Sequence, residues 1–220
     1  MVDEELLELA HFNRILKAFS TFSQRMTGRL RKHHQDWDRL EDSDRNNIIP
    51  EYLNRLDRIA ESFQINQNFF DLIVHENRDI DNYDENSNVM RPTDRDYENL
   101  RSTLRQIVRE WSDEGAAERE ASFTPILDAL KREFPNNKHS SGFNGISVLL
   151  PGAGLGRLAW EISRIGFDVQ GNEFSLYMLL TSQFILNNCP LPLQHSIIPF
   201  AFPLSNHLRI DSIPTIAQIE

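Results

Sequence analysis

The stretch SVLLPGAGLGRLAWEISRIGFDVQGNEFS, residues 147–175, decides the fold class of this 220-residue chain. It begins in a short continuous apolar run, whose branched residues are typical of a strand buried on both faces of a sheet. Three glycines at alternate positions follow, and then GRLAWEISRIG, whose apolar residues recur at helical spacing. FDVQGNE returns to a strand pattern, and another apolar helical segment comes after it. Strand, helix, strand and helix in this order predict an α/β fold with a parallel sheet.

The three glycines, Gly152, Gly154 and Gly156, stand between the first predicted strand and its helix. Because glycine has no Cβ atom, a ligand can lie against the main chain here, and exposed N–H groups attract carboxylate or phosphate oxygens. Glu173 comes at the end of the second predicted strand, and the carboxyl ends of neighbouring parallel strands face one crevice. An acidic side chain there can accept hydrogen bonds from both hydroxyls of a ribose. The stretch therefore predicts a nucleoside-binding site.

The glycine spacing narrows the choice of nucleoside. A dinucleotide fingerprint requires a third glycine at the sixth position, and that position is Arg157 here. Alternate glycines followed by an acidic residue suit a nucleoside without a pyrophosphate, of which S-adenosylmethionine is the commonest cofactor. A dinucleotide site and a purely structural turn stay open as alternatives.

Before this stretch the sequence has helical character. Apolar residues at three- and four-residue steps predict one long amphipathic helix over residues 4–40, and the same pattern predicts a second helix over residues 52–74. A short connection between two long helices favours an antiparallel pair. Paired apolar helices are also compatible with a homodimer. The polar, turn-rich residues 75–94 are expected to form a loop.

Two more helices are predicted ahead of the glycines. One should start at Thr93 or Asp94 and run to Gly115, and the next should cover residues 116–134, with Pro125 as the position where it would break. On the first of these helices Gln106 and Arg109 lie on the side opposite its apolar residues, so they are free to cap a ligand crevice.

The change of pattern after residue 140 predicts two domains. Residues 1–140 should form an all-helical region, and residues 141–220 the first part of a ligand-binding α/β domain. The last 31 residues, rich in proline, should form loop and short turns. Two parallel strands do not make a stable doubly wound sheet, which usually has about five or six strands. The sheet is therefore expected to be incomplete in this chain.

Composition excludes several classes of function. A formal net charge of −10 without a basic stripe argues against a nucleic-acid surface. The acidic start is unlike a secretory signal, and no window approaches the roughly 18 apolar residues of a membrane span, which favours a cytoplasmic or nuclear protein. Cys189 is the only cysteine, and the adjacent His33 and His34 point about 100° apart on a helix, so no metal site is expected.

The segment VLLPGAGLGRLAWEISRIGFDVQGNEFSLYMLLTSQFILN closely resembles the carnosine N-methyltransferase family, also described as N2227-like proteins. PGAGLGRLA and QGNE are specific signatures of that family, and LRSTLRQIVREWSDEGAAERE upstream resembles it too. The likeness covers about residues 94–188. Pro151, where many methyltransferases of this general fold have an acidic residue, is part of the family's own pattern.

The resemblance implies a class I methyltransferase with a Rossmann-like sheet. Its helices over residues 94–134 would pack on the site of S-adenosylmethionine, and the methyl group would pass to an imidazole nitrogen of carnosine to give anserine. Arg109 would pair with the methionine carboxylate of the cofactor. The family's cofactor contacts map onto Gln106, Arg109, Gly152, Gly154 and Glu173.

The resemblance also implies what this sequence lacks. In the family, residues that recognise the dipeptide follow a segment like IPDVDP, which would begin at about Glu220. We therefore assign no catalytic residue and expect the 220-residue chain to be incomplete and inactive on carnosine. Two alternatives stay open: a truncated, non-catalytic helical partner of a complete subunit, and a nucleotide-binding enzyme of other chemistry.

Overall fold

The computed structural model divides into two compact units. One comprises Met1–Leu104 and His195–Ala217, and the other comprises Arg105–Gln194 and Gln218–Glu220. The predicted loop over residues 75–94 and the predicted start of the α/β domain lie largely outside the described residues, as does most of the proline-rich tail. The division at residue 140 stays a prediction. The structure describes residues 4–46, 52–77, 91–135, 146–201 and 217–218.

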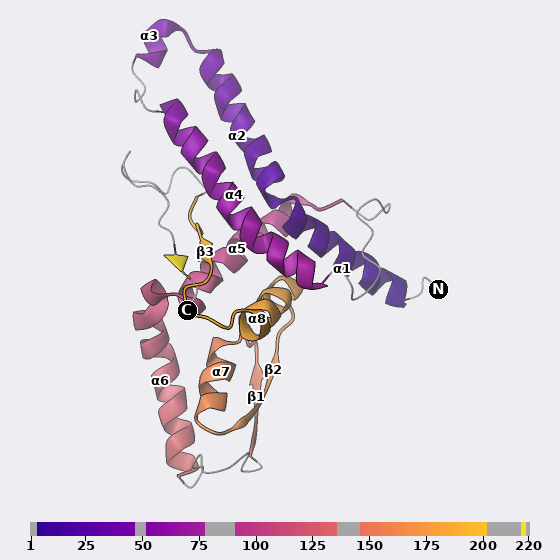
Figure 1. Cartoon of the computed structure of the whole chain (residues 1–220), viewed down its shortest axis with the longest axis vertical. Coiled ribbons are helices and arrows are strands. Elements are labelled where there is room, and N and C mark those ends of the chain that lie inside the picture. The colour runs from indigo at the N-terminus through magenta and orange to yellow at the C-terminus, as the bar shows by residue number, and fades with distance from the viewer. Residues whose placement is uncertain (1–3, 47–51, 78–90, 136–145, 202–216, 219–220) are drawn as a thin grey trace. The chain divides into compact units, whose positions relative to one another are not determined.

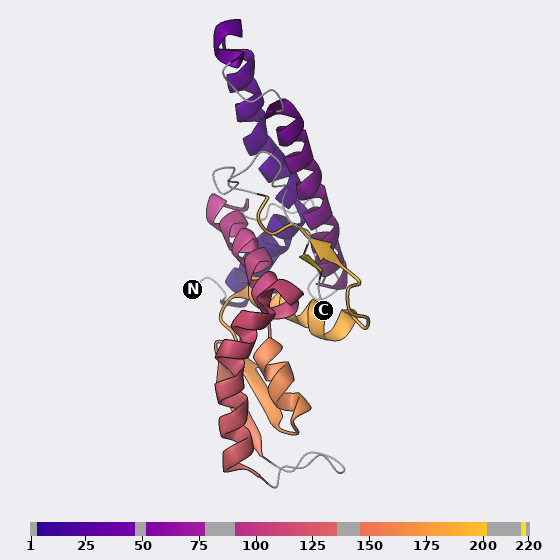
Figure 2. The same ribbon diagram turned by 90° about the vertical axis from the view of Figure 1, so that its left-hand side faces the viewer.

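The first unit is built from helices, as the sequence predicts. Figures 1 and 2 show α2 and α4 side by side and running in opposite directions, so the predicted antiparallel pair is confirmed for these two helices. A two-residue strand, β3, packs on α4. The elements of this unit are α1 (Glu4–Ser20), α2 (Phe22–Asp38), α3 (Asp42–Arg45), α4 (Tyr52–Asn77), the first part of α5 (Asp94–Trp111) and β3 (Ser196–Ile197).

The prediction of one helix over residues 4–40 is wrong, because α1 ends at Ser20 and α2 begins at Phe22. Thr21 between them has φ −115° and ψ 12°, and its hydroxyl donates to the Lys17 carbonyl at 2.5 Å. Gln67 of α4 satisfies backbone groups at the break: it accepts from the N–H of Ser23 at 2.8 Å and donates to the carbonyl of Phe19 at 2.9 Å. A polar side chain from a distant helix therefore stabilises the interruption.

The core of the first unit is aromatic. Phe70 meets Phe19 and Phe22 edge to face, with ring centroids 5.1 Å apart in both pairs, and Phe63 lies edge-on to Phe22 at 6.4 Å. All four rings are buried. Burial of each such side chain stabilises a fold by about 1.5–3 kcal/mol. The predicted amphipathic pattern is thus the source of this core.

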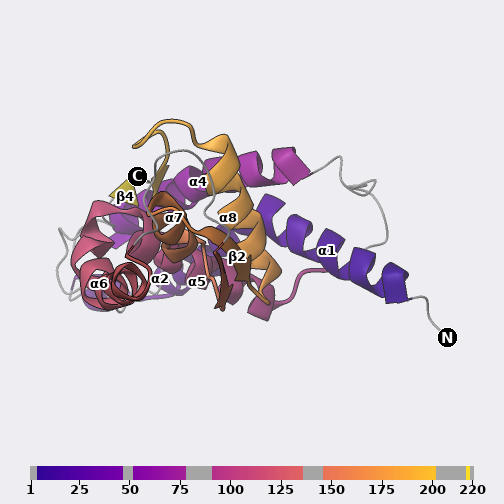
Figure 3. The same ribbon diagram turned by 90° about the horizontal axis from the view of Figure 1, so that it is seen from below.

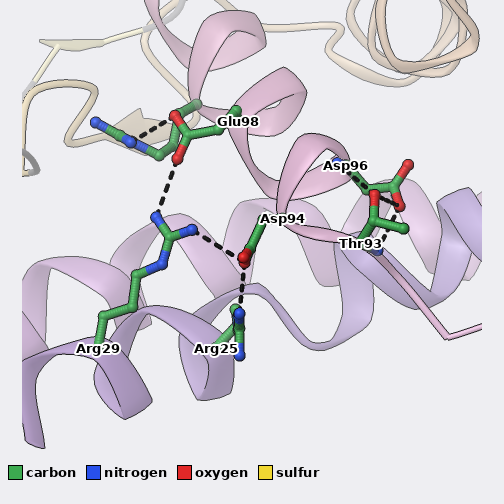
Figure 4. Close-up of polar contacts among 7 residues, drawn as sticks. Arg25, Arg29, Thr93, Asp94, Asp96 and Glu98 are labelled. Atoms are coloured by element: carbon green, nitrogen blue, oxygen red, sulfur yellow. Dashed lines mark hydrogen bonds and ion pairs between the residues drawn. The ribbon is translucent and has the colours of Figure 1, made fainter.

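The N-terminus of α5 is held by a cap and by ion pairs (Figure 4). The Asp96 carboxylate accepts from the Thr93 N–H at 2.6 Å and from its hydroxyl at 2.7 Å, which confirms the predicted helix start. Arg25 and Arg29 of α2 both donate to Asp94, and Arg29 also donates to Glu98 at 2.9 Å. These contacts tie α2 to the first two turns of α5.

The second unit has the predicted order of strand, helix, strand and helix. β1 and β2 pair in parallel, with Ser147 opposite Asp168 and Pro151 opposite Asn172, so the α/β prediction is confirmed as far as these strands go. Figures 1 and 3 both show α6 and α7 on the same side of the strands. The elements are the end of α5, η1 (Asp113–Gly115), α6 (Ala116–Glu133), β1 (Ser147–Pro151), α7 (Arg157–Arg164), β2 (Asp168–Asn172) and α8 (Leu176–Asn188); β4 (Ala217–Gln218) follows near the end of the chain.

Burial of β1 differs from the prediction. Its residues alternate between exposed and half-buried, and Leu149 keeps 59% of its surface exposed. The continuous apolar run therefore does not mark a strand covered on both faces among the described residues. The physical reason is that a parallel strand is buried by neighbours on both edges and helices on both faces, and β1 pairs only with β2 in the described sheet.

Two helix boundaries also differ. α5 ends at Trp111, and Gly115 belongs to a separate 3₁₀ turn. α6 continues through Pro125 without a break. Pro125 and Ala121, four residues before it, are both exposed, so water can satisfy the carbonyl that loses its partner at a proline.

Candidate functional site

The turn between β1 and α7 uses the three glycines in the backbone conformation that other residues avoid. φ is +68° at Gly152, +58° at Gly154 and +81° at Gly156. At Gly154 a Cβ atom would also lie 2.6 Å from the Glu110 carboxylate oxygen Oε1. The loop thus needs glycine at this position for a contact within the protein.

Glu173 lies directly after β2, where the sequence predicts it, and it contacts the same turn. Its carboxylate accepts from the N–H of Gly154 at 3.0 Å and from the N–H of Ser175 at 2.8 Å. The side chain is only half-buried. An ionised carboxylate has about four lone-pair positions, so two acceptor positions remain beyond these two bonds.

The polar side of α5 reaches the turn through Glu110, which sequence analysis did not single out. Glu110 is 7% exposed. Its carboxylate accepts from the N–H of Leu155 at 3.1 and 3.2 Å and from the N–H of Arg157 at 3.2 Å. The one sequence signal for it is its position four residues after Gln106, on the same helix face.

Gln106 and Arg109 continue this network outward. The Gln106 amide donates to Glu110 at 2.6 Å, and Arg109 donates to the Gln106 oxygen at 3.2 Å. Arg109 also donates twice to Glu118 of α6, at 2.8 and 2.5 Å, and this contact raises the pKa of its guanidinium. Arg109 nevertheless stays 57% exposed. The side chains form a continuous polar line from solvent to the glycine turn.

A cleft of about 290 Å³ lies between α5, α6 and the turn, all within the second unit. This volume is at the lower end of the roughly 300–1,000 Å³ of small-molecule sites. Charged side chains of α5 and α6 line part of its wall, and the apolar side chains of Phe123 on α6 and Leu158 on α7 line another part. Four of the five predicted site residues line it, and the fifth, Glu173, touches the turn from β2.

Two tryptophans near the turn serve packing. Trp111 is buried and donates its indole N–H to the Leu155 carbonyl at 3.1 Å. Trp160 lies 5.9 Å from it, and the Arg157 guanidinium lies 4.9 Å from both ring centroids. These contacts hold the far side of the turn and leave the cleft side to other residues.

Other groups offer less chemistry. Among the described residues, no group of three or more His, Cys, Asp or Glu side chains is placed to hold a metal ion, and no described helix has the length and apolar character needed to cross a bilayer. Cys189 is half-buried, and burial raises the pKa of its thiol to about 11. A thiol with that pKa is a poor nucleophile near neutral pH.

Comparison with known sequences shows the family of the chain. A sequence profile described as Carnosine N-methyltransferase matches residues 86–219, which include the α5 helix, the glycine turn and Glu173. The chain belongs to the carnosine N-methyltransferase family. The carnosine N-methyltransferase of Rattus norvegicus is 35% identical over 213 residues, which are 94% of this chain and 52% of the rat protein.

Other carnosine N-methyltransferases match in the same way. The protein of Schizosaccharomyces pombe is 35% identical over 220 residues, covering 95% of this chain and 56% of its own length. That of Dictyostelium discoideum is 32% identical over 226 residues, covering 95% and 48%. The chain thus spans about half the length of the carnosine N-methyltransferases it matches.

Proposed function

We propose that this chain carries the methyl-donor site of an S-adenosylmethionine-dependent carnosine N-methyltransferase, which converts carnosine to anserine. The observation that carries the proposal is that side chains from two elements converge on one turn. Glu173, directly after β2, contacts the turn, and on α5 a line of hydrogen bonds runs toward it from Arg109 through Gln106. Membership of the family supplies the reaction class. The sheet would be of the class I methyltransferase, Rossmann-like type, and the protein would act in the cytoplasm or in the nucleus.

The residues present fit this cofactor. Glu173 has two acceptor positions beyond its backbone bonds, which suit the two ribose hydroxyls. Arg109 uses three of the five N–H donors of its guanidinium, so two remain for the methionine carboxylate. Phe123 and Leu158 supply apolar wall in the cleft. The described donors and acceptors therefore match a nucleoside that also bears a carboxylate.

The reaction asks the protein mainly for alignment. S-adenosylmethionine, when bound, supplies a methyl group on a sulfonium leaving group. The protein has to hold a neutral imidazole nitrogen in line with that methyl group. We assign no described residue to carnosine. The proposed site is therefore that of the methyl donor alone.

Titration calorimetry with S-adenosylhomocysteine and with NAD tests the donor site. The chain should bind S-adenosylhomocysteine and should not bind NAD measurably. Arg109→Ala should weaken S-adenosylhomocysteine binding about tenfold or more, the size expected for a lost charge-assisted hydrogen bond. The variant should stay folded, because the Arg109 side chain is exposed. Glu173→Gln should also weaken S-adenosylhomocysteine binding, because an amide can accept fewer hydrogen bonds from the ribose hydroxyls than a carboxylate can.

Arg132→Ala is the matched control, because Arg132 is an exposed arginine of α6 outside the cleft. Equal affinity of the wild type, Arg109→Ala and Glu173→Gln would rule out the assigned roles. Binding of NAD in place of S-adenosylhomocysteine would favour a nucleotide-binding enzyme of other chemistry. Binding of neither would favour a non-catalytic helical partner.

A further inference from the structure

Most backbone N–H groups of the glycine turn, those of residues 153–157, already have acceptors within the protein. Ala153 donates to the carbonyl of Asn172 at 2.9 Å, and Gly156 donates to the carbonyl of Ala153 at 2.9 Å. Gly154 donates to Glu173, as described above. The two N–H groups left in the run, those of residues 155 and 157, both donate to Glu110. Five consecutive N–H groups, residues 153–157, therefore have acceptors within the chain.

This occupancy overturns the expectation that the turn offers exposed N–H groups to a ligand phosphate or carboxylate. The start of a helix is normally a binding place for anions, because its first N–H groups lack partners and the helix dipole favours negative charge. At the start of α7 a carboxylate of the chain itself takes that place. A ligand phosphate brought there would meet the Glu110 charge and no free N–H among residues 153–157.

The surrounding residues are built to admit this carboxylate. Gly154 lacks the Cβ that would collide with Glu110, and the Gln106 amide donates to the same Oε1 atom. Glu110 is nearly fully buried, so its interactions are little screened by water. Removal of the carboxylate group, as in Glu110→Ala, would leave the N–H groups of Leu155 and Arg157 without this acceptor.

We propose that Glu110 is an internal anion that sets the ligand specificity of the turn, by excluding nucleotides with a phosphate or pyrophosphate and admitting nucleosides without one. The inference rests on the proposed function, since it explains why the cleft would take an adenosyl sulfonium compound in preference to a dinucleotide. Glu110 acts as a positioning and specificity residue and need not touch the reacting atoms.

The test compares the affinities of ADP, inorganic pyrophosphate and S-adenosylhomocysteine at constant ionic strength. The wild type should bind S-adenosylhomocysteine far more tightly than either phosphate compound. Glu110→Gln keeps the size of the side chain and removes its charge, so the ratio of ADP affinity to S-adenosylhomocysteine affinity should rise at least tenfold. Glu120→Ala, which removes an exposed carboxylate of α6, should leave the ratio unchanged.

Chemical rescue tests the internal anion separately. Glu110→Ala should have a lower melting temperature than the wild type, and formate, acetate or phosphate should raise it by several degrees more than chloride does at equal ionic strength. The same salts should shift the wild type and Glu120→Ala equally little. A purely structural role for Glu110 would lower the melting temperature without anion-specific rescue and without a change in the ligand ratio.

Some outcomes overturn the proposal directly. Wild-type chain that binds ADP or pyrophosphate as tightly as S-adenosylhomocysteine would refute it, whether or not the variants fold. An unchanged affinity ratio in folded Glu110→Gln would also refute it. If the wild type binds none of the three ligands, the proposed donor site fails, but anion-specific rescue of Glu110→Ala would still support Glu110 as the anion of the turn.

Discussion

At Gly154 the hydrogen that replaces a side chain serves two needs at once. The backbone has φ +58°, a conformation that costs other residues about 1–2 kcal/mol, and a Cβ would lie 2.6 Å from Glu110. Gly152 has a similar φ, +68°, but a Cβ there would meet no atom within 4 Å. Substitution of Gly152 therefore tests backbone strain alone, and substitution of Gly154 tests backbone strain together with steric collision.

We predict that Gly154→Ala lowers the free energy of unfolding by at least about 1 kcal/mol more than Gly152→Ala does, because overpacking adds to the strain. Urea unfolding at neutral pH measures both variants. Combining Gly154→Ala with Glu110→Ala should cost less than the sum of the single changes, since the second removes the colliding carboxylate. Equal losses for the two glycines, or strict additivity, would contradict the described contact.

At the scale of elements, the separation of α1 from α2 depends on α4. Gln67 accepts from the Ser23 N–H and donates to the Phe19 carbonyl, so its amide partners two backbone groups that an uninterrupted helix would pair with each other. An amphipathic pattern that runs through the break does not reveal it, because the compensating group lies 44 residues away in sequence.

Gln67→Leu should lower the free energy of unfolding by about 2–4 kcal/mol, because it leaves two backbone groups without partners, each at a cost of about 1–3 kcal/mol. Gln64→Leu, at an exposed position of the same helix, should change it by no more than about 0.5 kcal/mol. Urea denaturation followed by circular dichroism compares them. A similar small effect of both changes would mean that the break does not need Gln67.

The ion pairs between α2 and α5 make another element-level contact sensitive to pH. Hydrogen bonds from Arg25 and Arg29 lower the pKa of Asp94. Burial acts to raise the pKa of Glu98, but pairing with Arg29 and Arg101 outweighs it, and the pKa is lowered. A carboxyl with a lowered pKa in the folded state stabilises the fold above its ordinary pKa, and this contribution is lost as the pH falls through the lowered value.

Arg29→Met should therefore reduce stability more at pH 7 than at pH 3, where protonated carboxyls no longer need the arginine. The difference between wild type and variant, measured by urea unfolding from pH 7 down to pH 3, should shrink below about pH 4. It should also shrink in 1 M salt, because the two carboxylates that pair with Arg29 are exposed. Arg31→Met, on the same helix, serves as control; a pH-independent difference for Arg29→Met would contradict this role.

At the scale of the whole molecule, local patterns predict the order of elements well. Glycine punctuation and the change from strand to helix period place β1, α7, β2 and α8 correctly, because each signal lies within the element or at its ends. The position of Glu173 after β2 follows for the same reason. Burial is predicted less well than element order, because the exposed fraction of the β1 residues depends on which strands and helices pack against β1.

The sequence by itself determined the parallel α/β unit, the helical character of the residues before it, the family, and two of the α5 residues that line the cleft, Gln106 and Arg109. Only the tertiary structure decided which acceptors occupy the N–H groups of the turn, since Glu110 lies 45 residues from Leu155. Buried main-chain groups must find partners somewhere in the fold, and a helical or strand period says nothing about which distant side chain provides them. The sequence predicts free N–H groups at this turn that could bind an anion, but in the structure the Glu110 carboxylate of the same chain already accepts hydrogen bonds from two of them.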